Sequence, residues 1–205
     1  MTATEKLLQH QDALRSTADA ISADLQLEKL LTAVGRPVRV GSYALGLMVR
    51  RDLDVTVICP ELDAQTLEAV AGIGAQLAQH KRVRQVRFRD DTGEWNTDPD
   101  YPDGLYLGVD CRSQEGEEWN LDIWFVDEPG RQPDLAHLKE LPARLTPGTR
   151  AAILGIKQTW ADRAEYGKSV KSVDIYRSVL VDHVRTPEQF DEWRAARGPE
   201  HGPDA

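Results

Sequence analysis

The spacing of apolar positions divides the chain into helical and extended segments. Apolar residues fall near one face of a helix over residues 4–34 and again over 63–79, at the spacing of amphipathic helices. Shorter runs rich in β-branched and other apolar residues predict strands. The expected strands cover residues 38–40, 53–59, 83–88, 105–109 and 119–126. The pattern therefore predicts an α/β (α+β) fold in which a β-sheet is flanked by helices.

After Pro133 the pattern of apolar positions becomes helical. Thr146 followed by Pro147 is an N-cap with proline at the first helical position, which predicts a helix to about residue 165. A second helix is expected over 173–184, and the capping box at 186–189 opens a third. We therefore expect three parts: an α/β domain with N-terminal helices over 1–145, a helical C-terminal subdomain over 146–197, and a disordered, polar tail over 198–205.

Composition restricts the kinds of partner. The net charge of −9 disfavours generic electrostatic attraction to nucleic acid or to an anionic membrane. No apolar run approaches the length that spans a bilayer, and the first residues lack the apolar core of a signal peptide. The two cysteines, Cys59 and Cys111, lie in apolar, strand-like surroundings, which favours buried thiols over a disulfide or a nucleophile. We expect a cytoplasmic protein.

Candidate chemistry is concentrated between residues 40 and 54. A tight turn, Val40-Gly41-Ser42, precedes Asp52 and Asp54 by a spacer of nine residues. Residues two apart on a strand point to the same face, so the two carboxylates should project together. Such a pair repels itself unless a cation neutralises it, and hard divalent ions prefer oxygen ligands. With a glycine turn that presents N–H groups and the Ser42 hydroxyl, the segment predicts Mg²⁺-dependent chemistry on a nucleoside triphosphate.

This segment resembles the signature of the nucleotidyltransferase superfamily related to DNA polymerase beta. In that family a third acidic residue lies on a later strand, and here Asp122 stands between apolar neighbours in the segment 120–124. The resemblance implies a mixed β-sheet nucleotidyltransferase module. It implies that Asp52 and Asp54 hold the metal ions and that Asp122 completes the second metal site and acts as general base.

The same resemblance gives roles to the turn. Gly41 lets the backbone approach the phosphates without a Cβ clash, and Ser42 donates a hydrogen bond to a terminal phosphate oxygen. The alternative is that the three aspartates form ordinary salt bridges with Arg50 or Arg51, which leaves the turn and the spacing unexplained.

Basic residues around this motif have two interpretations each. Arg50 and Arg51 either clamp phosphate oxygens or are solvated loop charges. Related helical subdomains often lend a lysine to the nucleotide, which makes Lys157 a candidate, although a surface lysine with a packed stem is the favoured alternative.

The segment 168–176 is similar in kind to one that faces the base in related enzymes. There we favour Ser172 as an N-cap and Tyr176 as a core residue, and the roles of Lys168 and Lys171 stay open.

A basic strand and an acidic loop follow one another. The arginines and lysine of residues 81–89 fit an edge strand that blocks further pairing, with binding of an anionic acceptor as the alternative. The loop over 90–103, with Trp95 and Tyr101, is long enough for a lid or an acceptor-binding loop. Its acidity suits a cationic acceptor such as an aminoglycoside, although a solvated loop is favoured. The five histidines do not cluster with other metal ligands, so zinc is not expected.

The sequence thus predicts an enzyme that moves a nucleoside monophosphate from an NTP, with ATP weakly favoured, to a hydroxyl acceptor, with Mg²⁺ or Mn²⁺ as cofactor. A small molecule or a protein side chain is the expected acceptor, a long nucleic acid is not, and a small RNA end remains open. No membrane is expected, and the oligomeric state is not determined. The alternative is a nucleotide-binding regulatory or antitoxin-like module that acts through a protein partner.

Overall fold

The computed structural model describes residues 2–197. It divides into two compact units, each described here by itself. One unit comprises residues 13–141 and holds the β-sheet. The other comprises the first twelve residues together with those from Pro142 onward, as far as the structure describes them, and is helical. The expected tail over 198–205 lies outside the described residues.

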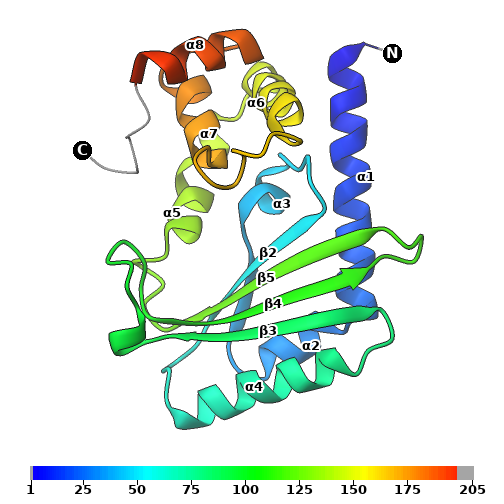
Figure 1. Cartoon of the computed structure of the whole chain (residues 1–205), viewed down its shortest axis with the longest axis vertical. Coiled ribbons are helices and arrows are strands. Elements are labelled where there is room, and N and C mark those ends of the chain that lie inside the picture. The colour runs from blue at the N-terminus through cyan, green and yellow to red at the C-terminus, as the bar shows by residue number, and fades with distance from the viewer. Residues whose placement is uncertain (1, 198–205) are drawn as a thin grey trace. The chain divides into compact units, whose positions relative to one another are not determined.

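The first unit is built on a five-stranded mixed sheet (Figure 1). The strand order is β1-β2-β5-β4-β3, and only β2 and β5 run parallel to each other. The strands are β1 (Arg36–Arg39), β2 (Asp52–Ile58), β3 (Val83–Asp91), β4 (Gly104–Arg112) and β5 (Glu118–Val126). The expected basic strand is β3, and it lies at one edge of the sheet as predicted, where its charges disfavour further strand pairing.

Helices cover one face of this sheet. Figure 1 shows α2 and α4 along the same side of the strands. The helices of the chain are α1 (Ala3–Asp24), α2 (Leu27–Thr32), α3 (Gly41–Leu45), α4 (Ala64–Ala78), α5 (Pro133–Glu140), α6 (Pro147–Trp160), α7 (Ser172–Leu180) and α8 (Pro187–Arg197), with 3₁₀ turns at Gly93–Trp95 and Pro142–Arg144. Side chains from the second half of α1, from α2 and from α4 pack with every second residue of the strands to form the core.

Burial alternates along the strands as the period-two pattern predicts. On β2, β4 and β5 the odd-numbered residues are buried in the core, for example Leu53, Leu107 and Leu121. Most of the even-numbered polar residues lie on the opposite face and are only partly buried, among them Asp54 and Asp122. We call this second face the open face of the sheet.

The first predicted helix is wrong in one respect: it is two helices. Gln26 separates α1 from α2 in the left-handed conformation, with φ of 52°. Leu25 and Leu27 on either side are both buried, because the reversal turns both side chains inward where a continuous helix would separate them by about 200°. The periodicity of the apolar residues does not reveal this break, since it survives on both sides of it.

The helical unit differs from its prediction mainly at its boundaries. Thr146 caps α6 as expected and exchanges hydrogen bonds with Thr149, but the helix ends at Trp160, earlier than predicted. The prediction of Ser172 as an N-cap is wrong, since the cap position is Lys171. There the Asp174 carboxylate accepts from the Lys171 N–H at 2.7 Å, which ends the preceding loop one residue earlier.

No helix within the described residues is long and apolar enough to cross a membrane.

Candidate functional site

Three aspartates share the open face at neighbouring positions of the two parallel strands. Asp54 of β2 stands directly opposite Asp122 of β5, and Asp52 stands opposite Asn120. Strands in a sheet are about 4.8 Å apart, and side chains at the same register of a parallel pair lie on the same face. The backbone therefore brings together the three aspartates that the sequence singled out from positions about seventy residues apart.

The glycine turn lies against one of these carboxylates. Gly41 adopts a left-handed conformation with φ of +59°, and a Cβ added there would lie 2.2 Å from Oδ2 of Asp54. The N–H of Val40 donates to the carbonyl oxygen of Asp54 at 3.0 Å, which fixes the turn beside the strand. Glycine is therefore required here first because the Asp54 carboxylate occupies the space of a side chain. Ser42 follows as a buried residue whose carbonyl oxygen accepts from Leu47 at 2.8 Å.

A polar network connects the residue after Ser42 to α1. The Tyr43 hydroxyl donates to Oδ1 of Asp19 at 2.7 Å, and Arg39 donates to both Asp19 and Tyr43. Arg39 also donates to the Ser22 hydroxyl at 3.1 Å. The turn that carries Gly41 and Ser42 is thus held on both sides, by a strand hydrogen bond before it and by this network after it.

Asp122 has a partner that sequence reasoning missed. The hydroxyl of Tyr106, on β4, donates to Oδ1 of Asp122. Tyr106 reaches it by lying over Gly108, which pairs with Asp122, and a Cβ at Gly108 would stand 2.6 Å from the Tyr106 hydroxyl. Burial and then the hydrogen bond and charge of Asp122 raise the pKa of Tyr106 above its ordinary value, so the hydroxyl keeps its proton.

The residues present fit a hard cation in donor type and in register. Three carboxylates share one face at neighbouring positions, which is the donor chemistry that Mg²⁺ and Mn²⁺ prefer. As the side chains lie, no group of three or more His, Cys, Asp or Glu residues within residues 2–197 has an arrangement that could hold a metal ion. The Tyr106 contact directs one oxygen of Asp122 toward β4, on the side away from β2.

Arg51 precedes the first aspartate and lies at the surface. Its guanidinium forms an ion pair with Glu117 at 2.6 Å, and its side chain is about half exposed, at 49%. Its carbonyl oxygen accepts from the N–H of Asn120 at 3.0 Å. The arginine backbone is thus part of the β2–β5 pairing, whereas its side chain is held by an exposed ion pair of the weak kind.

Lys157 belongs to the helical unit and is buried there, so the expectation of a surface lysine is wrong. Only 2% of it is exposed, and its Nζ lies 3.3 Å from the hydroxyl of Tyr176, which is buried as predicted. Nearby on the same unit the Tyr166 hydroxyl and the Ser172 hydroxyl are 2.9 Å apart. A lysine so deeply buried is uncommon unless its ammonium has polar neighbours, which the pattern of apolar residues could not show.

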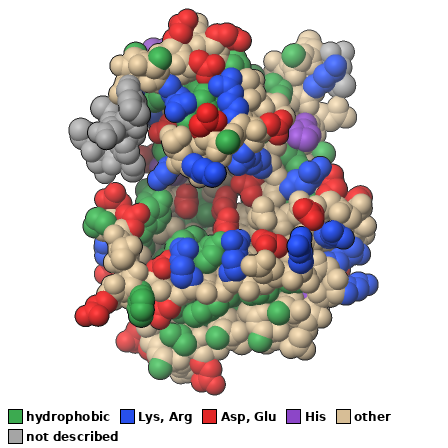
Figure 2. All heavy atoms as spheres, in the orientation of Figure 1, with side chains coloured by type: hydrophobic (Ala, Val, Ile, Leu, Met, Phe, Trp, Pro, Cys, Tyr) green, Lys and Arg blue, Asp and Glu red, His purple; other side chains and the backbone are tan. Residues whose placement is uncertain are grey.

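Basic side chains mark the edge of the open face. Figure 2 shows Lys and Arg side chains across the part of the sheet where β3 and β4 run. Arg87 forms a salt bridge of 3.5 Å with Asp110 of β4, and Arg89 forms one of 2.7 Å with Asp91. The basic strand is therefore neutralised in part by its own neighbours.

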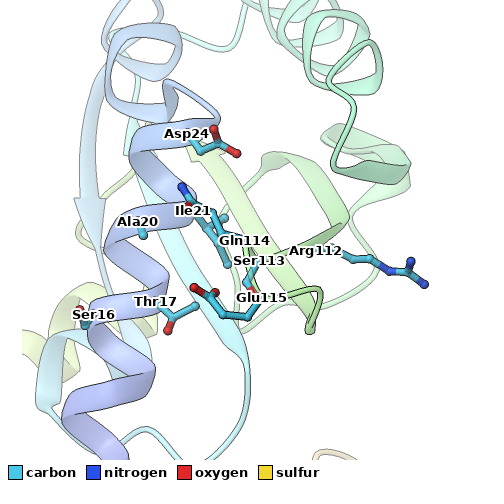
Figure 3. Close-up of a pocket in the computed structure, with 9 residues that line it drawn as sticks. All are labelled: Ser16, Thr17, Ala20, Ile21, Asp24, Arg112, Ser113, Gln114 and Glu115. Carbon is cyan, nitrogen blue, oxygen red and sulfur yellow. The ribbon is translucent and has the colours of Figure 1, made fainter.

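A small cavity lies elsewhere in the sheet unit, between α1 and the β4–β5 turn. It measures about 150 Å³, and its lining includes Thr17, Asp24 and Glu115. In Figure 3 the Glu115 carboxylate lies near Thr17, whereas the Arg112 side chain points away from the cavity. The volume is below the range of ordinary ligand pockets, about 300 to 1,000 Å³, so this cavity is no candidate for a nucleotide.

Comparison with known proteins gives a fold. No protein-family model matches the chain, and no curated protein matches it significantly. Among solved structures, a cytoplasmic RNA terminal U-transferase has a TM-score of 0.53 and 15% identity over 86% of this chain and 54% of that one. Terminal uridylyl transferase 4 from Trypanosoma brucei has a TM-score of 0.49 and 15% identity, covering 87% of this chain and 58% of its own. For Cid1 the TM-score is 0.48 and the identity 18%, with 86% and 46% covered.

The chain spans about half the length of these structural neighbours, 54% in the first of them. At such identities the likeness establishes the fold alone. The predicted fold class, a mixed sheet flanked by helices as in nucleotidyltransferases, is confirmed.

Proposed function

We propose that this chain transfers a nucleoside monophosphate from an NTP to a hydroxyl acceptor and releases pyrophosphate. The observation that carries the proposal is the pairing of Asp54 with Asp122 on adjacent parallel strands, with Asp52 on the same face and the Gly41 turn against Asp54. Salt bridges with a structural role do not account for a left-handed glycine held against a carboxylate. A site that must admit a triphosphate beside clustered acids accounts for both features.

The proposed reaction is an attack of the acceptor hydroxyl on the α-phosphate of the NTP. The acceptor oxygen attacks the α-phosphorus and forms a new P–O bond, while the bond from that phosphorus to the bridging oxygen of the β-phosphate breaks. Pyrophosphate carries away the electron pair of the broken bond. Asp122 takes the acceptor's proton on Oδ2, because its Oδ1 already accepts from Tyr106.

Asp52, Asp54 and Asp122 are the residues that would hold Mg²⁺ or Mn²⁺. When bound, such an ion supplies charge neutralisation for the triphosphate and for the oxygens that attack and leave. Without a bound ion the carboxylates repel the negatively charged NTP. The turn therefore has to attract the phosphates through the N–H groups at Gly41 and the hydroxyl of Ser42.

We assign two further residues to nucleotide binding. Arg51 contacts phosphate oxygens after giving up its exposed pair with Glu117, which costs little because such pairs contribute only about 0–1 kcal/mol. Lys157 is proposed as the second contact, which requires that its ammonium, buried in the helical unit beside the Tyr176 hydroxyl, becomes accessible. Each Ala variant is expected to raise KM for the NTP more than it lowers kcat.

The test is incubation with each of the four labelled NTPs, Mg²⁺ or Mn²⁺ and a panel of hydroxyl acceptors, with release of pyrophosphate as readout. The panel contains nucleosides, aminoglycosides, a serine- and tyrosine-containing peptide and short RNA. RNA is included because the first structural neighbour is an RNA terminal U-transferase. We expect Asp54→Asn to lower turnover by about 10²- to 10³-fold with an unchanged melting temperature.

Asp110→Asn is the matched control. Asp110 lies on the same face of the sheet, one strand away from Asp122, and is held by Arg87. Removing its charge is expected to change turnover by less than about threefold, since it pairs with no residue of the proposed site. Equal losses in both variants, or no pyrophosphate with any acceptor while NTP still binds, would overturn the proposal. The second result favours a regulatory module that acts through a partner.

A further inference from the structure

A cavity of about 430 Å³ opens on the sheet unit beside Trp124 of β5. It lies between the end of β3, the loop that follows it and β5, and its volume is in the range of pockets for small molecules. Its principal side chains are Arg89, Trp95, Tyr101 and Trp124. Three of the nine residues that line the cavity are aromatic, in a chain of which only 6% is aromatic.

The cavity and the proposed site share strand β5. Trp124 follows Asp122 by two residues on β5, so both side chains project from the open face about 7 Å apart along the strand. Tyr106 joins them: its ring centroid lies 5.0 Å from that of Trp124, and its hydroxyl donates to Asp122. A ligand on Trp124 therefore has Asp122 within reach of its substituents.

A planar cation lies on this aromatic floor. The Arg89 guanidinium carbon is 4.9 Å from the Tyr106 ring centroid and 5.4 Å from that of Trp124. Its Nε donates to both oxygens of Asp91, at 2.9 and 2.7 Å. Arg89 is thus oriented and its charge is compensated, which leaves its flat face, together with the indole, as a surface for stacking.

Trp95 lines the cavity as a second aromatic side chain and lies on a 3₁₀ turn. It is 75% exposed, which is unusual for so large an apolar side chain. The 3₁₀ turn that carries it is fastened to the end of the loop, because Asp103 accepts from the Gly93 N–H at 2.9 Å and from the Asn96 side chain at 3.0 Å. The backbone that carries Trp95 is therefore fastened, and its indole lines the cavity with most of its surface facing solvent.

Several carboxylates of this loop accept hydrogen bonds from donors in the same loop. Asp90 accepts from the N–H and the hydroxyl of Thr92 at 3.0 and 2.7 Å, and Asp98 accepts from the Asp100 N–H at 3.1 Å. Hydrogen bonds from Gly93 and then from Asn96 hold the pKa of Asp103 below its ordinary value. Carboxylates engaged in this way shape the loop while they keep their charge, so the acidity of the loop does not by itself indicate a cationic acceptor.

We propose that this cavity binds a planar heteroaromatic ring of the acceptor, of the kind found in a small nucleoside. The ring stacks against Trp95 on one side and against Trp124 with Arg89 on the other. The hydroxyl-bearing substituent of the ring then extends toward Asp122. That the bound ring belongs to the acceptor rests on the proposed nucleotidyl transfer. Binding of the ring itself can be measured without catalysis.

The test uses adenosine as probe, without NTP or metal, on the ¹⁵N-labelled full chain. Two of the five tryptophan indole N–H signals, those of Trp95 and Trp124, are expected to shift, and the signal that Trp95→Ala removes identifies the first. Trp95→Ala is expected to weaken adenosine binding by about 5- to 150-fold, the range for loss of one stacking ring. Trp95→Phe should restore most of it.

Phe88→Ala is the matched control, because Phe88 is also an exposed aromatic side chain, at 42%, and does not line the cavity. It should leave adenosine binding unchanged. Kanamycin, a cationic polyol without an aromatic ring, should shift neither indole signal. Kanamycin binding in place of adenosine, or equal adenosine affinity in wild type and Trp95→Ala, would overturn the inference.

Asp54→Asn separates this inference from the proposed function. The variant should bind adenosine as the wild type does, since Asp54 does not line the cavity. A wild type that binds adenosine at the indoles but transfers no nucleotide contradicts the proposed function alone. If the wild type transfers nucleotide but Trp95→Ala leaves adenosine binding unchanged, only the cavity assignment is contradicted.

Discussion

The two faces of the five-stranded sheet are built from the same strands and have opposite chemistry. Leu53, Leu107 and Leu121 lie on the face that α1, α2 and α4 cover, and each is at most 1% exposed. Their sequence neighbours Asp54 and Asp122 lie on the open face. Residues of the core and candidate site residues thus alternate along each strand, so substitutions on the two faces should have different consequences.

The largest expected effect is on the covered face. Leu107→Ala removes a fully buried side chain opposite Ile123, and it should lower the free energy of unfolding by about 2–5 kcal/mol. Urea denaturation followed by circular dichroism measures this loss. Asp110→Asn, three residues along the same strand but on the open face, should change it by less than about 0.5 kcal/mol. Equal costs in both variants would contradict the separation of the faces.

Gly41→Ala tests the close approach of the glycine turn to the Asp54 carboxylate. The substitution combines left-handed strain with a Cβ 2.2 Å from Oδ2 of Asp54. Gly93→Ala is the matched control, since φ there is +54° but nothing lies within 4 Å of the added Cβ. Gly93→Ala should cost about 1 kcal/mol and Gly41→Ala about 1–3 kcal/mol more. Chemical denaturation of both variants checks the difference, and equal costs would show that Asp54 moves aside freely.

Tyr106→Phe isolates the hydrogen bond between Tyr106 and Asp122 on the open face. The ring and its contact with Trp124 are retained, while the hydrogen bond to Asp122 is lost. We expect the free energy of unfolding to fall by about 0.5–1.5 kcal/mol. In an Asp122→Ala background the same change should cost close to nothing, and a double-mutant cycle measures that difference. A cost that persists in that background would assign the effect to packing of Tyr106.

The smallest effect concerns the two thiols of the core. Burial, followed by nearby carboxylates, raises the pKa of Cys59 and of Cys111 to about 11. Native protein at pH 8 should therefore react with a thiol reagent far more slowly than protein unfolded in urea. Because the folded pKa lies above the unfolded one, the stabilising contribution is complete below about pH 9 and is lost as the pH rises toward 11. Rapid reaction of either thiol in the native state would place it outside the core.

Much of the sheet unit was predictable because strand signals are local. The run 53–59 was expected as a central strand and is β2, paired on both sides, and the helix expected over 63–79 is α4, with Asp63 as its N-cap. The same-face placement of Asp52 and Asp54 follows from the pleat alone. The break at Gln26 was missed because a single left-handed residue leaves the apolar periodicity on both sides intact.

The partners of the site residues were not predictable. Tyr106 reaches Asp122 and Trp124 through the register of β4 against β5, and a shift by one residue would send Tyr106 to the other face. The buried position of Lys157 next to Tyr176 depends on how α6 packs with α7. Acidic residues 90–103 had suggested a cationic ligand, whereas the structure uses several of them to fasten the loop.

The amino-acid sequence alone was enough to single out Asp52, Asp54 and Asp122 as candidates and to place them on one face of their strands, because both depend on local backbone geometry and on the polarity of neighbouring positions. Packing between distant segments decided that Asp122 stands opposite Asp54, that the Asp54 carboxylate occupies the place of a side chain at Gly41, and that Trp124 lines a cavity together with Trp95. The physical reason is that strand register and loop closure are set by packing and hydrogen bonds between segments far apart in the chain, whose effects no local pattern contains.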